Sequence, residues 1–528
     1  MKPLILKNAQ FYTFNSEQPT ADTLFIEDGI IQFAGNFDQL DPVVKTGAEI
    51  QDLEGAFVLP GFTDAHIHLL EYGLSLQRVD CETGTRAECI ARVQQRVEHA
   101  KPGEWVLGHG WNHNIWQEGK GNKTQLDEFS PDNPIYLTHK SLHSGWANSA
   151  ALKAAGIDRN TNDPKGGLIE KEENGEPTGI VYEGAMRLVE EAIPTPNANQ
   201  RKSALENAQE KLISLGITAV HDFDVWECFL TLREMEQEGN LKISVTKSIP
   251  YPKLDEAIET KLRSGTGSEL LRIGWLKLFS DGALGSQTAA MLEPYEGSDS
   301  LGMLFLTSTE LVDIGRKAMG AGISLAVHAI GDRANREVID GFAQLNSEGY
   351  FGLVDIQPRI EHVQIISPED VLRLAELGIW ASMQPIHAVS DRDMADKYWG
   401  ERCRYAYAWK SVLNAGVNLI FGSDAPVESP NPIWGLSAAI ARTSPGNHQQ
   451  ARENWVPDQR ISLEEALNAY IPAPYAAAGF DGRSGRLMNG TAADLAVFKQ
   501  NLFTLSLNAL ADIYPDSCMI RGEWAFKK

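Results

Sequence analysis

Short apolar runs alternate with amphipathic helical patterns through the middle of the chain, which is typical of a parallel α/β domain. Eight of the runs predict buried strands, and this number favours a closed barrel over an open doubly wound sheet. In chain order they are residues 61–68, 217–223, 243–249, 272–282, 324–330, 359–364, 379–385 and 418–424. Helical patterns separate several of them; the one at 368–378 closes on Gly378, as expected of a helix terminus. No GxGxxG or P-loop pattern follows any run, which weakens a nucleotide-binding interpretation.

The two ends of the chain show short β-type runs broken by turn residues. In residues 1–58, Asp28-Gly29 lies between two apolar pairs and predicts a two-residue hairpin. Residues 484–528 have the same character. We expect the two segments to form one small composite β-sandwich, with separate terminal hairpins as the alternative. Residues 59–483 would then form the α/β domain, a (β/α)8 TIM barrel.

A long segment separates the first two predicted strands, roughly residues 70–215, and is too long for one βα unit. It contains a predicted helix at 87–100, a predicted strand at 104–110 and loop-rich stretches. We interpret it as an insertion. Because barrel active sites lie at the C-terminal ends of the strands, we expect it to cover the barrel mouth and shape substrate access.

The composition of the chain limits the classes of binding partner that we expect. The 528 residues have a formal net charge of -24 and a pI near 5.0, which argues against nucleic acid or an anionic membrane surface. No apolar run approaches the length of a membrane-spanning helix, and no signal-peptide pattern opens the sequence. Five scattered cysteines without a CxxC pair suit a reducing compartment. We therefore expect a cytoplasmic protein with a small-molecule substrate, and we allow for a homodimer.

Metal-binding residue types fall at the ends of the predicted strands. His66 and His68 are two positions apart, so on a strand they project from one face about ~6.6 Å apart. Two such imidazoles can converge on one Zn²⁺. Three more strand ends and one strand interior supply His328, His362, Asp424 and Lys277.

Each of these residues also has a structural interpretation. A single histidine at a strand end is commonly a hydrogen-bonded core residue, an aspartate there a helix N-cap, and a buried lysine the partner of a carboxylate. His-x-His, Lys, His, His and Asp at the first, fourth, fifth, sixth and eighth strands form a coordinated pattern, however. The pattern favours a metal site at the mouth of the barrel.

The motifs around these residues are specific. VLPGFTDAHIHL is similar to the first-strand signature of the amidohydrolase superfamily, and GSDAPV resembles its last-strand aspartate motif. HKSLHSGWANSAAL, WLKLFSDGALGSQTA, AVHAIGDRAN, RIEHVQ and SMQP resemble the long branch of that superfamily that includes N-substituted formamide deformylases. EDGIIQFAG and MNGTAADLAVF resemble its terminal motifs, so the likeness covers essentially the whole chain.

This resemblance implies roles for the strand-end residues. His66 and His68 would bind the more buried of two divalent metal ions, expected to be zinc, and His328 and His362 the more exposed one. Lys277 would bridge both as a carbamate formed with CO2. A hydroxide shared by the metals would attack an amide, formamide or cyclic amide, and Asp424, also a metal ligand, would move the proton to the leaving nitrogen.

Several alternatives remain open at this stage. Lys277 could be unmodified, and an ester or lactone could replace the amide, because the same hydroxide would attack either carbonyl. A mononuclear deaminase-like enzyme is a second possibility, which Lys277 argues against. A catalytically silent barrel used as a scaffold is a third, although all six ligand positions hold coordinating residue types.

The residues expected to contact substrate or orient the ligands form a second group. His109, Trp111 and His143 lie in the insertion, where a packed cap is an equally good interpretation. Asp281, Gln384 and Glu361 lie near predicted strand ends and could orient metal ligands. His221, in the second strand, is expected to be structural.

Overall fold

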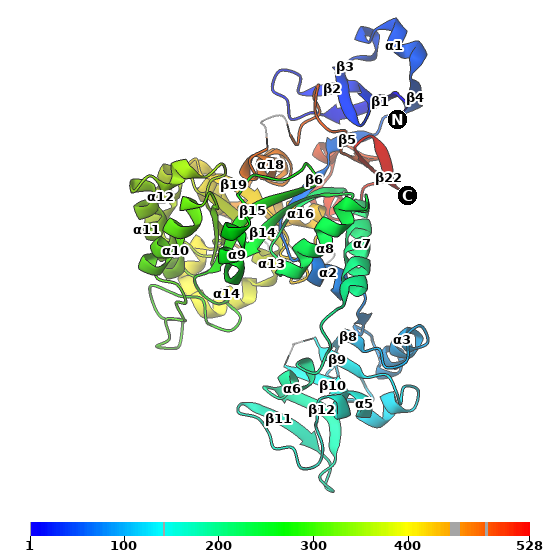
Figure 1. The fold of residues 1–528 in the computed structure, drawn as a ribbon, viewed down its shortest axis with the longest axis vertical. Helices are drawn as coiled ribbons and strands as arrows, with labels where there is room; N and C mark the ends of the chain where they lie inside the picture. Colours follow the sequence, from blue (N-terminus) through cyan, green and yellow to red (C-terminus); the bar gives the residue numbers. More distant parts are fainter. Residues whose placement is uncertain (1, 141–142, 444–454, 481–483) are drawn as a thin grey trace. The chain divides into compact units, whose positions relative to one another are not determined.

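The structure is a computed structural model, which describes residues 2–140, 143–443, 455–480 and 484–528. The chain divides into two compact units (Figure 1). The first consists of Met1–Tyr72 and Leu205–Lys528, and the second of Gly73–Ala204. We describe each unit by itself.

Eight parallel strands form the centre of the first unit. In hydrogen-bonded order they run from β19 through β18, β17, β16, β15, β14 and β13 to β6. An isolated parallel bridge between Ile67 and Ala425 joins the two edges, so the sheet is nearly closed into a barrel. The strands are β6 (Phe62–Ile67), β13 (Ile217–Asp222), β14 (Ser244–Pro250), β15 (Leu271–Phe279), β16 (Leu325–Ala329), β17 (Arg359–His362), β18 (Trp380–Met383) and β19 (Asn418–Phe421). The predicted TIM-barrel fold is confirmed.

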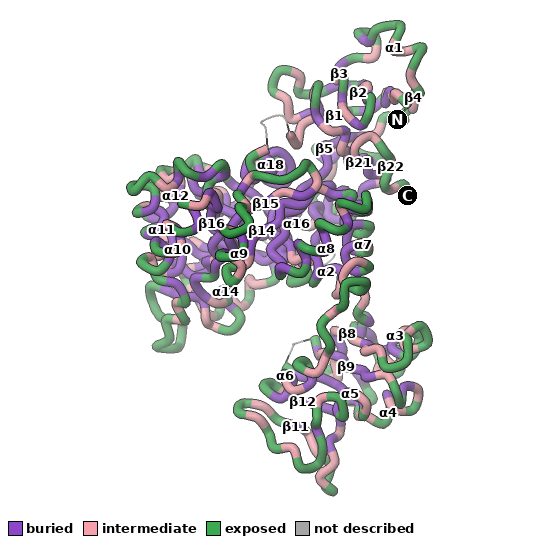
Figure 2. The backbone as a smooth tube through the Cα atoms, in the orientation of Figure 1, coloured by how far each residue is buried: buried purple, intermediate pink, exposed green. Residues whose placement is uncertain are grey.

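Helices cover the outside of this barrel. Most of them turn an apolar side toward the strands and a polar side outward, whereas α16 (Pro432–Ala441) is buried along almost its whole length (Figure 2). α12 begins with Pro368 in its first turn and ends before Gly378, whose φ of 66° confirms the predicted helix terminus. The larger helices around the barrel are α8 (Trp226–Gln237), α10 (Ser308–Gly320), α11 (Asp332–Ser347), α12 (Pro368–Leu377) and α16 (Pro432–Ala441).

A second sheet in this unit combines strands from both ends of the chain. β20 runs antiparallel to β5, and β5 in turn pairs with β1, so the N- and C-terminal segments share one sheet. The predicted hairpin at Asp28-Gly29 is confirmed between β2 and β3, with φ values of 50° and 79° that a type I′ turn requires. Its strands are β1 (Leu4–Tyr12), β2 (Thr20–Glu27), β3 (Ile30–Gly35), β4 (Glu49–Asp52), β5 (Phe57–Pro60), β20 (Leu495–Phe498), β21 (Ser517–Ile520) and β22 (Glu523–Lys527).

The Gly73–Ala204 unit has its own sheet and core. The strand order is β11-β12-β10-β9-β8-β7, and α3 (Arg86–Val97) packs against β7 and β8. Trp111, Trp116 and Trp146 lie in the larger of its two apolar clusters. The strands are β7 (Val79–Asp80), β8 (Val106–Trp111), β9 (Ile135–His139), β10 (Ser144–Ala147), β11 (Gly167–Lys171) and β12 (Pro177–Glu183).

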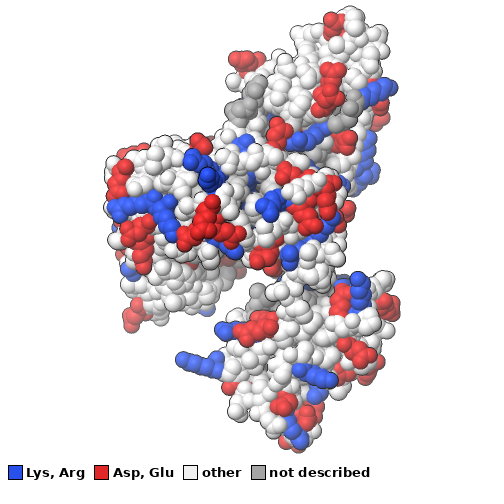
Figure 3. All heavy atoms as spheres, in the orientation of Figure 1, with Lys and Arg blue, Asp and Glu red and all other residues white. Residues whose placement is uncertain are grey.

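Three features of the structure concern the charged, cysteine and apolar residues of the composition. Acidic and basic side chains are interspersed over the face shown in Figure 3. All five cysteines are buried and free. Among the described residues, no helix combines the length and the apolar character that crossing a membrane requires.

Candidate metal centre

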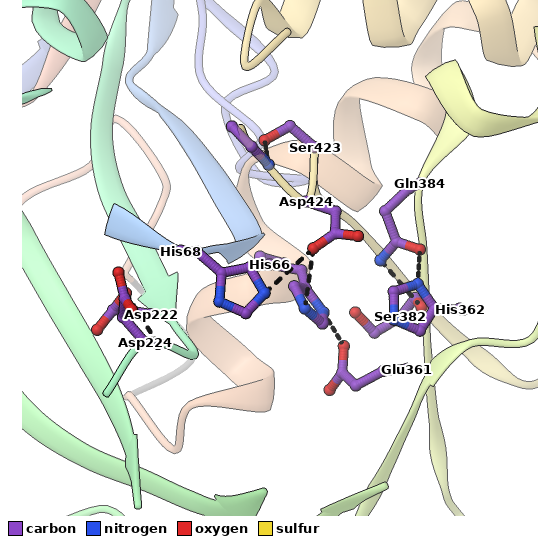
Figure 4. Close-up of polar contacts among 12 residues, drawn as sticks. His66, His68, Asp222, Asp224, Glu361, His362, Ser382, Gln384, Ser423 and Asp424 are labelled. Atoms are coloured by element: carbon purple, nitrogen blue, oxygen red, sulfur yellow. Dashed lines mark hydrogen bonds and ion pairs between the residues drawn. The ribbon is translucent and has the colours of Figure 1, made fainter. Parts of the chain in front are cut away.

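The first and last barrel strands meet at the metal-binding motifs. The two-residue spacing places His66 and His68 on one side of β6 and its extension, with ring centroids 5.8 Å apart. Both imidazoles present Nε2 to one oxygen of Asp424: the distances to Oδ1 are 3.5 Å and 3.3 Å (Figure 4). These three side chains therefore converge on one point at the C-terminal end of the barrel.

Backbone contacts fix this convergence. The Asp424 amide donates to the His66 carbonyl at 2.7 Å, and the His68 amide donates to the Ala425 carbonyl at 2.9 Å. Such close approach requires a glycine in β19's extension, because a Cβ on Gly422 would lie 2.3 Å from the His66 nitrogen. Asp424 itself has a φ of 61°, a left-handed conformation that is unusual for a residue other than glycine and is common at functional sites.

The buried carboxylate of Asp64 joins the first-strand motif to the last-strand motif through hydrogen bonds. Asp64 accepts hydrogen bonds from the Ser423 hydroxyl at 2.5 Å, the Ser423 amide at 2.9 Å and the His66 amide at 3.1 Å. Burial raises the pKa of Asp64 to about 7 against these hydrogen bonds. The aspartate of TDAHIH thus fixes the loop that presents Asp424, a role that the sequence analysis did not assign.

Glu361 orients His66. Nδ1 of His66 lies 2.6 Å from Glu361 Oε2, and burial, helped by Lys277 nearby, lowers the pKa of His66 to about 4. The neutral ring therefore donates from Nδ1, which leaves the Nε2 lone pair for a ligand; among the described residues this buried atom has no hydrogen-bond partner. Burial alone would raise the pKa of Glu361, but Arg359 and His66 hold it well below its usual range. Glu361 thus makes the contact with His66 that is expected of a residue that orients a metal ligand.

His362 is oriented in the same way. Its Nδ1 lies 2.9 Å from Gln384 Oε1, so Nε2 is left for a ligand (Figure 4). The His362 ring lies 5.0 Å from that of His66 and 4.5 Å from that of His328. Like Asp424, His362 has a left-handed backbone, with φ of 77°, and this turn ends β17 two residues before the predicted end.

His328 and Lys277 complete the group. His328 Nε2 lies 3.1 Å from the Gly282 carbonyl, and burial, followed by the nearby Lys277, lowers the pKa of His328 to about 3. Lys277 is 5% exposed, and its nitrogen lies 4.7 Å and 4.9 Å from the centres of the Phe223 and Phe279 rings. In the described part of the chain no carboxylate lies within 4.0 Å of it, and burial lowers the pKa of Lys277 to about 8. A buried ion pair therefore does not account for this lysine.

The other residues expected near the site have contacts of their own. Asp281 accepts backbone hydrogen bonds from Ala290, Ile330 and Gly331, which fix the loops after β15 and β16. Trp111 is 1% exposed, and its indole donates to the Leu137 carbonyl, so its contacts are those of a core residue.

The two histidines of the Gly73–Ala204 unit differ in exposure. His109 is half-buried and bonds to Thr138 through Nδ1 at 2.8 Å. His143 is exposed and forms an ion pair with Glu183 at 3.0 Å. In the barrel, the predicted structural residue His221 contacts Arg359 through Nδ1 at 2.9 Å.

A second residue at the site, His387, was not assigned a role from the sequence. His387, on α13 (Pro385–Ser390), is 6% exposed and stacks on His362 with ring centroids 6.2 Å apart and an interplanar angle of 11°. Its Nε2 lies 3.8 Å from Asp424 Oδ2. The only signal in the sequence was its position three residues after Gln384, which by itself does not distinguish it from a core histidine.

A neighbouring group of potential ligands already contains a cation. Asp222, Asp224 and Cys228 lie close enough to share a metal ion. Lys247, fully buried, places its ammonium 2.9 Å from Asp222 Oδ2 and donates to the Asp224 carbonyl at 2.5 Å. This lysine already supplies a positive charge to the group, so we interpret it as structural.

Glu361→Gln tests the orienting role of this carboxylate. We expect metal affinity to fall by about 10- to 100-fold, because the neutral amide oxygen of a glutamine is a weaker acceptor for the His66 Nδ1–H than the carboxylate it replaces. The metal-free protein should also lose about 3 kcal/mol or more of unfolding free energy, because Arg359, fully buried 2.5 Å from Glu361, is left without its counter-charge. Competition against a chelator and denaturant unfolding measure the two effects.

Glu369→Gln is the matched control, because Glu369 is 84% exposed in its ion pair with Arg336. We expect less than about 0.5 kcal/mol from this change. Equal metal affinity in Glu361→Gln and the wild type would contradict the assignment.

Comparison with known proteins gives the family. The model of a family described as the amidohydrolase family matches residues 49–525. The chain is 32% identical to "Protein LONG AFTER FAR-RED 3" of Arabidopsis thaliana, over 94% of this chain and 87% of that one. It is 28% identical to an N-substituted formamide deformylase of Arthrobacter pascens, over 95% and 94% of the two chains.

A solved structure has the same architecture. It is that of an uncharacterized metal-dependent hydrolase from Pyrococcus furiosus, with 29% identity and a TM-score of 0.79 over 94% of this chain and 99% of that one. The resemblance inferred from the motifs is thereby confirmed. The chain belongs to the amidohydrolase family and is a hydrolase that acts on carbon–nitrogen bonds other than peptide bonds.

Proposed function

We propose that the chain is a binuclear, zinc-dependent amidohydrolase that cleaves an amide, formamide or cyclic amide. The observation that supports this best is the geometry of His66 and His362, which lie side by side with Nδ1 bonded to Glu361 and Gln384. Both rings therefore offer Nε2 to the same space. Neutral imidazoles held in this way are typical of metal ligands.

The donor set fits two divalent ions. His66 and His68 would hold the more buried ion with Asp424, and His328 and His362 the other. One buried atom of this set, His66 Nε2, has no hydrogen-bond partner among the described residues, which supports the assignment. Ions bound here would polarise the substrate carbonyl and lower the pKa of a water molecule toward neutrality.

Lys277 suits a bridge in its carbamylated form. A neutral lysine offers a single donor, whereas its carbamate offers two anionic oxygens. Only the neutral amine reacts with CO2, and the burial that lowers its pKa increases that fraction. The absence of a carboxylate within ion-pair distance, in the part of the chain described, supports this form over a structural ammonium.

Asp424 would move the proton. Its Oδ1 faces His66 and His68, while Oδ2 points to the other side, toward His387. One oxygen can thus bind metal while the other accepts the proton of the nucleophile and then delivers it to the leaving nitrogen. A C–N bond needs this protonation because an amine anion is a poor leaving group.

The substrate class rests on chemistry and on a relative. The name of the Arthrobacter pascens relative is that of a formamide deformylase. An amide or formamide also makes use of a proton donor at the leaving nitrogen, which an ester or lactone needs less. We therefore propose N-acyl and N-formyl compounds as substrates.

We also propose a reducing location such as the cytoplasm, which the five free, buried cysteines support.

Metal analysis is the first test. Protein purified without chelator in bicarbonate buffer should contain about two divalent ions per chain, as in other two-metal hydrolytic sites. Chelation should abolish hydrolysis of N-acyl and N-formyl compounds, and added Zn²⁺ with bicarbonate should restore it. A single ion per chain would favour a mononuclear deaminase-like enzyme, and no bound ion after reconstitution would favour a silent scaffold.

A further inference from the structure

We propose that His387 is a catalytic residue whose Nε2–H donates a hydrogen bond to the carbonyl oxygen of the substrate as that oxygen gains negative charge. This inference rests on the proposed amide hydrolysis. His387 lies on the side of the site that faces Asp424 Oδ2, beside the ring of His362.

The tautomer of His387 follows from its contact with Gln364. The Gln364 side-chain amide nitrogen lies 3.3 Å from His387 Nδ1 and donates to it. In a neutral imidazole with Nδ1 as acceptor, the proton is on Nε2. Nε2 is therefore a donor and does not offer a lone pair to a metal ion.

In the described part of the chain this donor has no acceptor. His387 Nε2 is buried and has no hydrogen-bond partner among the described residues, and Asp424 Oδ2, at 3.8 Å, is beyond hydrogen-bond distance. Leaving a buried donor unpaired costs free energy. A substrate oxygen within hydrogen-bond distance of Nε2 would remove that cost.

The neighbours of the His387 ring hold it in one orientation. It stacks almost parallel to His362, and α13, which carries it, begins directly after Gln384. The same short segment thus orients a proposed metal ligand and presents a donor to the space in front of it. Donors that are fixed before the reaction are the ones that stabilise a transition state most effectively.

The geometry suits an amide. Its oxygen and its nitrogen are bonded to the same carbon, so a substrate that presents its nitrogen to Asp424 Oδ2 can present its oxygen to His387 Nε2. Asp424 would then protonate the nitrogen as the C–N bond breaks, while His387 stabilises the negative oxygen of the tetrahedral intermediate. No proton is transferred from His387 in this scheme.

Substitutions of His387 that place an amide nitrogen at the position of Nε2 or of Nδ1 test the proposal. The amide nitrogen of a glutamine at this position can replace Nε2, whereas that of an asparagine replaces Nδ1. We expect kcat to fall about 100-fold in His387→Ala and His387→Asn but less than about 10-fold in His387→Gln. All three should retain about two metal ions per chain, with KM changed less than kcat; His99→Gln, an exposed histidine outside the barrel, should behave as wild type.

A measurement without substrate tests the tautomer. Long-range ¹H–¹⁵N spectra of metal-free protein labelled with ¹⁵N-histidine should show His387, assigned by its loss in His387→Gln, protonated at Nε2. Protonation at Nδ1 would overturn the proposal, as would loss of metal in His387→Ala or equal loss of kcat in the glutamine and asparagine variants.

The outcomes separate this proposal from the one on which it rests. If the wild type hydrolyses amides, Asp424→Asn does not and His387→Ala matches the wild type, only the proposal for His387 fails. If the metal-loaded wild type hydrolyses no N-acyl or N-formyl compound, the proposed function fails and the role of His387 fails with it.

Discussion

Asp424→Asn should retain both metal ions and lose turnover, with kcat lowered by about 10²- to 10⁴-fold, the usual contribution of a general acid–base residue. The asparagine keeps a carbonyl oxygen that can face His66 and His68, as Oδ1 does in the wild type. Its amide nitrogen, however, cannot accept a proton. Steady-state kinetics and elemental analysis of the same preparation measure the two effects.

The matched control is Asp313→Asn, on the surface of α10, where the aspartate is 70% exposed and pairs with Arg316. It should leave kcat and metal content unchanged. If Asp424→Asn turns over at a rate near that of the wild type, Asp424 is not the proton carrier. If it loses metal as well as activity, the carboxylate is needed mainly as a ligand.

Lys277→Ala should lose bridged metal and, with it, activity. Without the carbamate the two ions lack a shared anionic ligand, and we expect metal content to fall from about two ions per chain to one or fewer. Because the alanine leaves space in front of Phe223 and Phe279, a short carboxylate such as acetate can enter and supply two oxygens in place of the carbamate. Added acetate should therefore restore part of the metal content and of kcat.

Lys317→Ala is the control for the loss of a lysine, because Lys317 lies on the surface of α10 with a side chain 53% exposed. It should bind metal and turn over as the wild type does, with no response to acetate. Lys277→Ala with full metal content and activity would show that Lys277 is not a bridge. Loss of activity that no carboxylate restores, in a folded protein, would favour an unmodified lysine.

The barrel could be predicted from sequence because its strands are buried on both faces. β15 is buried from Ile273 to Leu278, and β16 is buried except at His328, so each strand appears as an apolar run in which a polar residue marks an unusual environment. Lys277 and Asp424 stood out for this reason. The boundaries were less accurate where the backbone departs from strand geometry, as at His362, whose left-handed φ ends β17.

What remained hidden depends on contacts between distant parts of the chain. Asp64 and Ser423 are joined only because the first and last strands close the barrel, and spacing along the sequence does not reveal that. His387 has its place at the site because α13 packs beside the end of β17 and the turn after β19. A histidine in a short apolar helix has no pattern that distinguishes this situation from a core position.

The shared terminal sheet has a consequence for synthesis. β5 ends at Pro60 and is followed after Gly61 by β6, yet its antiparallel neighbour is β20, which begins at Leu495. During synthesis on the ribosome, one edge of β5 therefore lacks its native neighbour until β20 (Leu495–Phe498) has emerged. A transcript cut short after the last barrel helix would encode every proposed metal ligand and still release a chain with an open strand edge, a template for aggregation. Cells expressing such a truncation should accumulate insoluble or degraded protein in place of a smaller enzyme.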